Sequence, residues 1–274
     1  MTQANPQEPA RKRTVLPGLT RRGGFTLHPF DLEHGVRTSG LIPGRHLRSG
    51  HRHDRHATAY FGVAPSVFLS LLRRWQRLPP EAPTRQFHFL DVGAGMGRAM
   101  LLASELPFAR VTGIELNPTL ARIARRNLTI WRTSQAISAK SRPPMKLMLG
   151  DAVDFAFPDA PCLLFCFNPF GEAVMRRLLR QITRCFASRP GWVDLIYVNN
   201  EQERVLEMQS GFTRLFLGQV RRSRADAIAD HRIMANQPDG EYMASNYEDC
   251  SIWRWTGKPT SGRTGLTLRR RADS

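Results

Sequence analysis

Residues 87–98 read Phe-His-Phe-Leu-Asp-Val-Gly-Ala-Gly-Met-Gly-Arg, and a helix-forming run, Ala-Met-Leu-Leu-Ala, fills residues 99–103. This order predicts a strand, a tight turn and a helix start. Glycine is used where the chain needs a positive φ or where a ligand contacts bare backbone. A helix start adds free N–H groups and the positive end of a dipole. The stretch therefore predicts a site for a small polar molecule at the carboxyl end of a strand.

The spacing of Gly93, Gly95 and Gly97 narrows the choice of ligand. The dinucleotide-binding fingerprint is G-x-G-x-x-G, but here the third glycine comes one residue early and Arg98 takes the place of the last fingerprint glycine. The pattern that starts at Asp91 instead resembles the first motif of class I S-adenosylmethionine (SAM) dependent methyltransferases. The resemblance implies that Asp91 and the three glycines bind SAM. The alternative is a glycine-rich turn without a ligand.

Two further strand ends carry acids. The apolar strand 110–114 ends at Glu115, and a carboxylate about 20 residues past the glycine turn is placed to accept hydrogen bonds from a ribose diol. The strand 145–149 is followed by Asp151 and Ala152. The resemblance implies that Asp151 accepts from the adenine amino group and that the next backbone N–H reaches the ring. The alternatives are a solvated acid for Glu115 and a helix N-cap for Asp151.

A fourth strand, 162–167, is apolar without alternation, as expected of a strand buried on both faces. It is followed by Asn168, Pro169 and Phe170. Methyl transfer requires a neutral, aligned acceptor nitrogen and a site closed to water. An Asn carbonyl, a backbone carbonyl before proline and an aromatic ring suit an amine acceptor. We therefore predict these three residues as the catalytic group, with an ordinary Asn-Pro turn as the alternative.

A second resemblance narrows the class of methyl acceptor. Methyltransferases that modify base amines or glutamine amides usually show Asn or Asp, then Pro-Pro, then an aromatic residue, whereas this chain has a single proline. From about residue 60 to residue 256, the sequence resembles the non-SET, histone-lysine type of protein lysine methyltransferase and its bacterial relatives. In these proteins a Tyr and a Pro-Ser precede the glycine motif, as Tyr60 and Pro65-Ser66 do here. The resemblance implies a protein lysine acceptor and a lid role for Tyr60, for which ordinary packing is the alternative.

Alternating strand and helix patterns from residue 87 onward predict an α/β fold with a doubly wound, seven-stranded, mostly parallel sheet (a Rossmann-like methyltransferase fold) and an N-terminal arm and helix extension. We divide the chain into a disordered basic tail (1–16), an arm and lid helix (17–85), a SAM-binding methyltransferase domain (86–256) and a second disordered basic tail (257–274). Residues 25–57 are expected to form an extended arm over the sheet. The insertion 218–249 is expected to be an acceptor-side flap, and 132–144 a disordered loop.

The cysteines and histidines predict no metal site. The four cysteines lack zinc-site spacing and are expected to be buried thiols. Four histidines crowd into residues 46–56, but arginines among them would repel a cation, so we expect a polar lid there. The chain has neither an apolar leader at its start nor an apolar run of membrane length, so we expect a cytoplasmic protein.

The formal net charge of +17 lies mostly in the N-terminal part, and its field would attract acidic partners such as nucleic acid. A basic surface without a dedicated partner is equally compatible with this composition. The main prediction is a SAM-dependent methyltransferase acting on a nitrogen, with a protein acceptor favoured over nucleic acid. The alternatives are RNA, DNA or a small molecule as acceptor, a nucleotide-dependent oxidoreductase, and a basic nucleic-acid-binding module with an inactive site.

Overall fold

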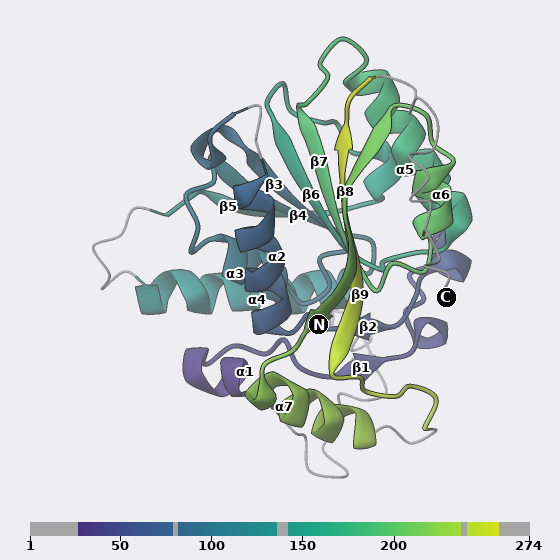
Figure 1. Cartoon of the computed structure of the whole chain (residues 1–274). Helices are drawn as coiled ribbons and strands as arrows, with labels where there is room; N and C mark the ends of the chain where they lie inside the picture. Colours follow the sequence, from purple (N-terminus) through teal and green to yellow (C-terminus); the bar gives the residue numbers. More distant parts are fainter. Residues whose placement is uncertain (1–26, 79–81, 136–141, 237–239, 258–274) are drawn as a thin grey trace, which may run out of the picture.

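Seven strands form the central sheet of this computed structural model, which describes residues 27–78, 82–135, 142–236 and 240–257. Their order is β5-β4-β3-β6-β7-β9-β8, and all run parallel except β9, which is antiparallel to both neighbours (Figure 1). The bounds are β3 His88–Val92, β4 Arg110–Glu115, β5 Met145–Leu149, β6 Cys162–Phe167, β7 Val193–Val198, β8 Phe212–Arg221 and β9 Tyr247–Trp255. The predicted doubly wound, mostly parallel sheet is confirmed.

Helices cover both faces of the sheet (Figure 1). One face packs against α2 (Pro65–Arg77), α3 (Arg98–Ala103) and α4 (Pro118–Gln135), and the other against α5 (Glu172–Cys185) and α6 (Glu203–Glu207). The strand period of two explains this division, since neighbouring residues of β3 such as Phe89 and Leu90 belong to the apolar clusters of opposite faces. The sheet is therefore buried on both sides, as the continuous apolar strands predict.

Three local expectations were wrong. Helix α4 continues to Gln135, so residues 132–135 are not loop; the hydroxyl of Thr133 donates to the Thr129 carbonyl one turn back, and no glycine or proline intervenes to end the helix. Residues 136–141 lie outside the described part. Cys185 is exposed because Phe186 takes the buried position at the end of α5. Finally, the arm was expected to be extended, but it contains a helix, two short strands and 3₁₀ turns.

The N-terminal arm contains α1 (Pro29–His34), a two-stranded antiparallel sheet of β1 (Leu41–Ile42) and β2 (Tyr60–Phe61), and single 3₁₀ turns at Gly44–His46 and Asp54–His56. A buried arginine of the sheet domain, Arg98, holds it in place, because its guanidinium donates to oxygens of Thr38, Ser39, Gly62 and Val63. Because these contacts are polar, the sequence of the arm shows no hydrophobic periodicity from which its structure could be predicted.

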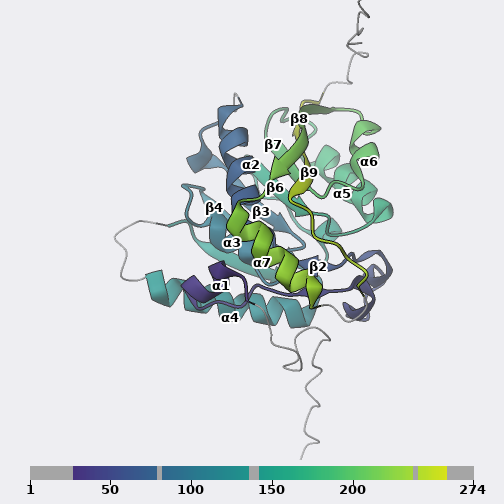
Figure 2. The same cartoon turned by 60° about the horizontal axis from the view of Figure 1, so that its bottom comes forward.

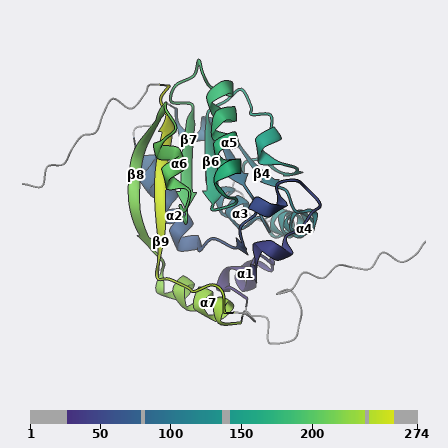
Figure 3. The same ribbon diagram turned by 90° about the vertical axis from the view of Figure 1, so that its right-hand side faces the viewer.

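The insertion between β8 and β9 contains α7 (Arg224–Ala235), which lies beside α1 at the carboxyl end of the sheet (Figure 2, Figure 3). Ser223 caps the helix, and Asp226 in its first turn accepts from the backbone N of Ser66 at the start of α2. The hairpin strands are longer than expected, because β8 runs to Arg221 and β9 starts at Tyr247. The insertion and the arm therefore meet on the edge of the sheet where ligands bind in this fold class.

The predicted basic tails lie outside the described residues, apart from Gly257. Within the described ranges, every helix is too short or too polar to cross a membrane.

Candidate cofactor and acceptor site

A cavity with an empty volume of about 990 Å³ lies at the carboxyl ends of β3, β4 and β6, where the strand order reverses. This topological switch point is where open α/β sheets bind ligands. The cavity is lined on one side by the glycine turn and on another by residues 57–63 of the arm. Most of the predicted site residues line it: Asp91, Gly93, Gly95, Glu115, Asp151, Ala152, Tyr60, Pro169 and Phe170. Gly97 and Asn168 do not.

The glycine turn needs its glycines for space as well as for conformation. Gly93 and Gly95 have φ values of 73° and 56°, which side chains rarely adopt. A Cβ on Gly95 would lie 2.2 Å from the Tyr60 ring, and one on Gly93 would lie 2.5 Å from the Pro169 ring. Gly97 precedes α3 with φ 90°, and a Cβ there would make only an ordinary contact with Ala124 of α4 at 3.4 Å. Gly97 is thus needed for its backbone conformation, whereas the other two glycines also lie against the cavity wall.

Glu115 ties the second strand to the glycine turn. Its Oε2 accepts from the backbone N of Gly95 at 2.7 Å, and its Oε1 accepts from that of Asn117 at 2.7 Å. The side chain is buried, so the alternative of a solvated strand-end acid is wrong. Burial raises the pKa of this carboxyl, and the backbone donors oppose the shift. Each carboxylate oxygen has a second lone pair, so the group retains capacity for donors of a ligand.

Asp91 carries a buried oxygen, Oδ2, that has no hydrogen-bond partner within the described structure. Burial and the neighbouring Glu115 raise the pKa of Asp91 to about 8. An unpartnered buried carboxylate is costly and calls for a donor or a cation. The turn is therefore suited to a ligand with hydroxyl or ammonium groups.

Asp151 is the N-cap of a 3₁₀ turn, as its alternative interpretation predicted, because its Oδ1 accepts from the backbone N of Val153 at 3.0 Å. Its Oδ2 also pairs with Nδ1 of His53 at 2.6 Å, and Arg177 donates to Nε2 of the same ring at 2.9 Å. Sequence reasoning missed this chain of contacts. Its one sequence signal was the histidine-rich segment, which was predicted only as a polar lid.

His51, His53 and Asp151 bring three potential ligand atoms within 4.8 Å of one another. However, both ring nitrogens of His53 are engaged, one with a carboxylate and the other with the Arg177 guanidinium. A permanent cation 2.9 Å from the ring opposes a metal ion at this place. The absence of a metal therefore stays a prediction, and the observed contacts support a latch between arm and sheet.

The arm binds the segment Asn168-Pro169-Phe170 through side-chain and backbone hydrogen bonds. Thr58 donates its hydroxyl to the carbonyl of Asn168, Phe170 forms a β-bridge with Ala57, and the backbone N of Gly171 donates to the His56 carbonyl at 2.9 Å. The carbonyl before the proline is thus already bonded to Thr58. This leaves the amide side chain of Asn168 as the polar group that the segment can offer to an acceptor.

Asn168 is 6% exposed and has φ 38°. Its Oδ1 lies 3.3 Å from the Tyr197 hydroxyl, a contact that sequence reasoning missed because Tyr197 belongs to the next strand. Tyr60 is also buried, with its ring on Gly95 and its hydroxyl donating to the carbonyl of Thr38 at 2.7 Å. Tyr60 thus both packs and lines the cavity. Its contact with a sulfonium stays a prediction.

Comparisons with known proteins give partial matches. No family model matches the chain. Over 41 residues it is 56% identical to the release factor glutamine methyltransferase of Vibrio cholerae serotype O1, a match that spans 15% of this chain and 14% of that enzyme. The chain thus spans about one seventh of the length of this curated relative, so the activity of the whole protein is a matter for proposal.

Similar solved structures include a candidate RNA methyltransferase from Pyrococcus horikoshii, with 16% identity, 70% of this chain and 84% of that chain covered, and a TM-score of 0.46. A precorrin-6y C5,15-methyltransferase from Geobacter metallireducens gives 16% identity, coverages of 70% and 87%, and a TM-score of 0.42. These TM-scores are low, so the likenesses carry no argument about activity or acceptor.

Proposed function

We propose that this chain is a SAM-dependent methyltransferase. The observation that carries the proposal is one pair of buried carboxylates at the glycine turn: Glu115, bonded to the Gly95 backbone, and Asp91, whose Oδ2 lacks a partner. A ribose diol and an α-ammonium group are donors that such carboxylates accept. The 41-residue match to a methyltransferase supports the same class.

The residues present fit SAM. Glu115 would hold the ribose, Asp91 the ammonium end, and Asp151 with Ala152 the adenine, while Tyr60 and the arm close the cavity. Bound SAM supplies a methyl group on an electrophilic sulfonium. The protein contributes placement and the exclusion of water, because an in-line displacement depends on alignment of the incoming lone pair. An oxidoreductase role is disfavoured, since Arg98 stands where the dinucleotide-binding fingerprint has its last glycine.

We further propose that the acceptor is a nitrogen, and in particular a lysine amine of a protein. The Asn168 amide supports this, because an amide oxygen can accept a hydrogen of a neutral amine and orient its lone pair. The single proline after Asn168 departs from the pattern of the enzymes that modify base amines and glutamine amides. RNA, DNA or a small molecule remains the competing acceptor, favoured by the basic net charge of +17.

Isothermal titration of the purified chain with SAM tests the activity class. We expect saturable heat with the wild type and a loss of affinity of at least about tenfold in Glu115→Gln, which keeps shape but replaces one acceptor oxygen by a donor. Absence of heat with the folded wild type would contradict the proposal. Transfer of labelled methyl groups from SAM into bulk protein rather than bulk RNA then tests the acceptor class.

A further inference from the structure

A second cavity, with an empty volume of about 1190 Å³, lies on the other side of the arm from the cofactor cavity. Residues of the arm, the ends of β6 and β7, and the insertion between β8 and β9 line it. Four residues line both cavities: Thr58, Ala59, Phe61 and Phe167. One layer of side chains and backbone therefore separates the two spaces.

Asn168 faces this second cavity, although Pro169 and Phe170 line the first. Its side chain is almost wholly buried, and its Nδ2 makes no hydrogen bond within the described residues. The Tyr197 hydroxyl can donate to the amide oxygen or accept from the amide nitrogen of Asn168, since a hydroxyl both donates and accepts. An amide at the wall of a cavity, with one end not bonded to the protein, can bind a further polar group there.

The backbone conformation beside the second cavity also indicates a binding site there. Asn168 and Asn199 are the only non-glycine residues with positive φ in the described ranges, at 38° and 48°, and both line the second cavity. They follow the ends of the neighbouring parallel strands β6 and β7. Unfavourable backbone conformations persist where the surrounding structure enforces them, and they concentrate at functional sites.

The walls of the second cavity are acidic, in contrast to the chain as a whole. Glu201, Glu248 and Asp249 line it, against one arginine, Arg222. That arginine is already engaged, because it pairs with Glu248 and lies 3.0 Å from the buried Asp230. Glu201 and Asp249 are exposed, and each lies within hydrogen-bond distance of a neutral amide, that of Asn199 at 3.3 Å and that of Gln219 at 3.1 Å. A negative cavity on a chain of net charge +17 attracts a cation and repels nucleic-acid phosphate.

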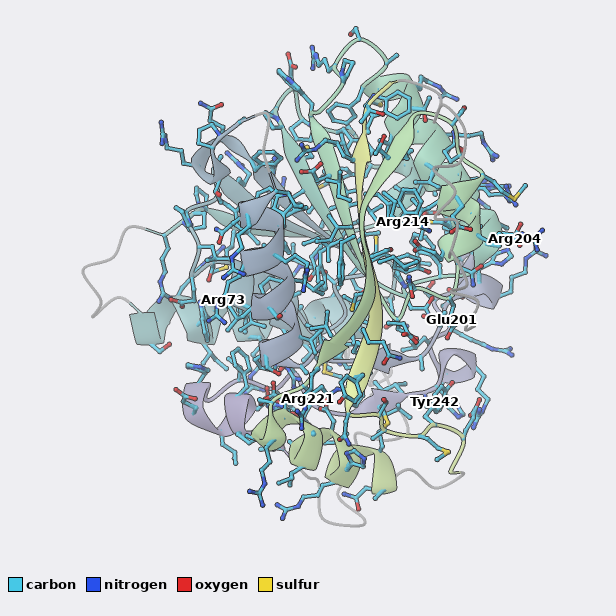
Figure 4. The ribbon with its side chains drawn as sticks, in the orientation of Figure 1. Arg73, Glu201, Arg204, Arg214, Arg221 and Tyr242 are labelled. Atoms are coloured by element: carbon cyan, nitrogen blue, oxygen red, sulfur yellow. The ribbon has the colours of Figure 1, made fainter. Side chains whose placement is uncertain are left out.

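The rim of the cavity belongs to the end of the insertion. Tyr242 lies on the same side of the molecule as Glu201 (Figure 4), and both line the cavity. Met243 is 91% exposed and Tyr247 is 42% exposed beside them. An ion pair between Glu241 and Arg45 fixes this rim to the arm. Exposed aromatic and methionine side chains around acidic walls suit a peptide that carries cationic side chains.

We propose that the second cavity is the acceptor site and that it binds a basic peptide segment, whose lysine side chain reaches Asn168 and crosses the thin layer at Thr58 and Ala59. This inference rests on the proposed methyltransferase function. A long unbranched side chain can reach across one layer of residues, whereas the phosphates of a nucleic acid would meet the carboxylates of Glu201 and Asp249.

The reaction balances with these parts. The lysine ammonium first loses a proton, which leaves through the exposed mouth of the cavity to solvent. The nitrogen lone pair then forms the new bond to the methyl carbon of SAM while the carbon–sulfur bond breaks, and the sulfur keeps that electron pair as a neutral thioether. The acidic residues at the mouth bind the charged form, and the less polar passage favours the neutral amine, since burial disfavours an unpaired charge.

The test is fluorescence anisotropy of a labelled lysine-rich peptide at low salt, without SAM. We expect the double variant Glu201→Gln/Asp249→Asn to bind the peptide roughly tenfold more weakly than the wild type, because two partly exposed cation contacts are lost. The control Glu33→Gln/Asp159→Asn changes the net charge equally at two exposed carboxylates of other regions and should bind within about twofold of the wild type.

Equal binding by the double variant and the wild type would overturn the proposal, as would equal losses in the double variant and its control. A labelled RNA oligonucleotide is the second probe: if it binds, the peptide does not, and the double variant binds it more tightly, the acceptor is nucleic acid and the proposal is wrong. SAM titration of the same preparations separates the two claims. Unchanged SAM affinity with lost peptide binding supports both, and peptide binding without SAM binding contradicts the methyltransferase alone.

Discussion

The two cavities are built in different ways. On the cofactor side, Glu115 bonds to Gly95 and Asn117, residues that lie 20 and 2 positions away in the chain. On the acceptor side, Thr58 reaches Asn168 across 110 positions. Consecutive strand–turn–helix units thus supply the acids and glycines of the cofactor cavity, whereas the N-terminal arm and the insertion between β8 and β9 supply much of the acceptor cavity. The chemistry of the first follows from local sequence, and that of the second depends on tertiary docking.

The largest effect should come from detaching the arm, which forms a wall of both cavities. We expect Arg98→Ala to lower the free energy of unfolding by about 3–5 kcal/mol, because it leaves the buried Asp31 carboxylate without its cation and two backbone carbonyls without their donor. Urea denaturation measures the change. The control Arg176→Ala removes an exposed i,i+4 pair with Glu172 and should cost less than about 0.5 kcal/mol. Similar losses in both variants would show that the arm contributes little.

A substitution that affects only the cofactor side should have the next largest effect. We expect Gly95→Val to lower SAM affinity at least about 100-fold, roughly 2.7 kcal/mol, because its Cβ would meet the Tyr60 ring at 2.2 Å and its φ is 56°. Titration calorimetry gives the affinity. Gly171→Ala is the matched control, since a Cβ there meets nothing within 4 Å and φ is −75°. Retained SAM affinity in Gly95→Val would remove the glycine turn from the cofactor site.

The two substituted residues, Gly95 and Arg98, also show which features could be predicted from the sequence and which could not. The strand and helix order, the sheet class and the position of Glu115 followed from apolar runs, glycine spacing and an acid at a strand end. Such signals lie within about 25 residues of one another, so no tertiary information is needed to connect them. Arg98 was noticed only as a departure from the dinucleotide fingerprint, although the structure shows it as the anchor of the arm.

The acceptor side could be predicted only in part. Asn168 stood out because Asn-Pro follows a buried strand, and the insertion 218–249 stood out by its length. Thr58 had no local signal, because a polar residue in an irregular segment shows no period that identifies what it will contact. Tyr197 lies in the buried strand β7, where the apolar pattern does not show which residue its hydroxyl will contact. Even the side of the layer that Asn168 faces was not predictable, since its φ of 38° turns it away from Pro169 and Phe170.

The buried acid of the cofactor side should give the chain a pH dependence. The folded pKa of Asp91 is about 8, against an ordinary value of 3.8, so the folded chain binds this proton more tightly than the unfolded chain. Its contribution to stability is therefore complete below about pH 4 and is lost as the pH rises toward 8, with a slope of up to about 1.4 kcal/mol per pH unit. Asp91→Asn should flatten this dependence and be the more stable form at pH 8.

Urea midpoints of the two proteins, measured at pH 5 and pH 8 without SAM, check this expectation. Parallel changes in both would show that another group controls the pH dependence, for example Glu248, whose pKa is raised to about 7 mainly by burial.

The smallest and most selective effect should come from Asn168, where the two cavities meet. Asn168→Gly removes the amide but keeps a residue that tolerates the φ of 38°, so the fold should remain intact, whereas alanine would add backbone strain. We expect turnover to fall about tenfold and SAM affinity to stay within about twofold, because the amide faces the acceptor cavity and not the cofactor cavity. Initial rates with the methyl acceptor and SAM titration measure the two quantities. If SAM affinity falls as far as turnover does, Asn168 acts on the cofactor side, and the division of labour between the two cavities is wrong.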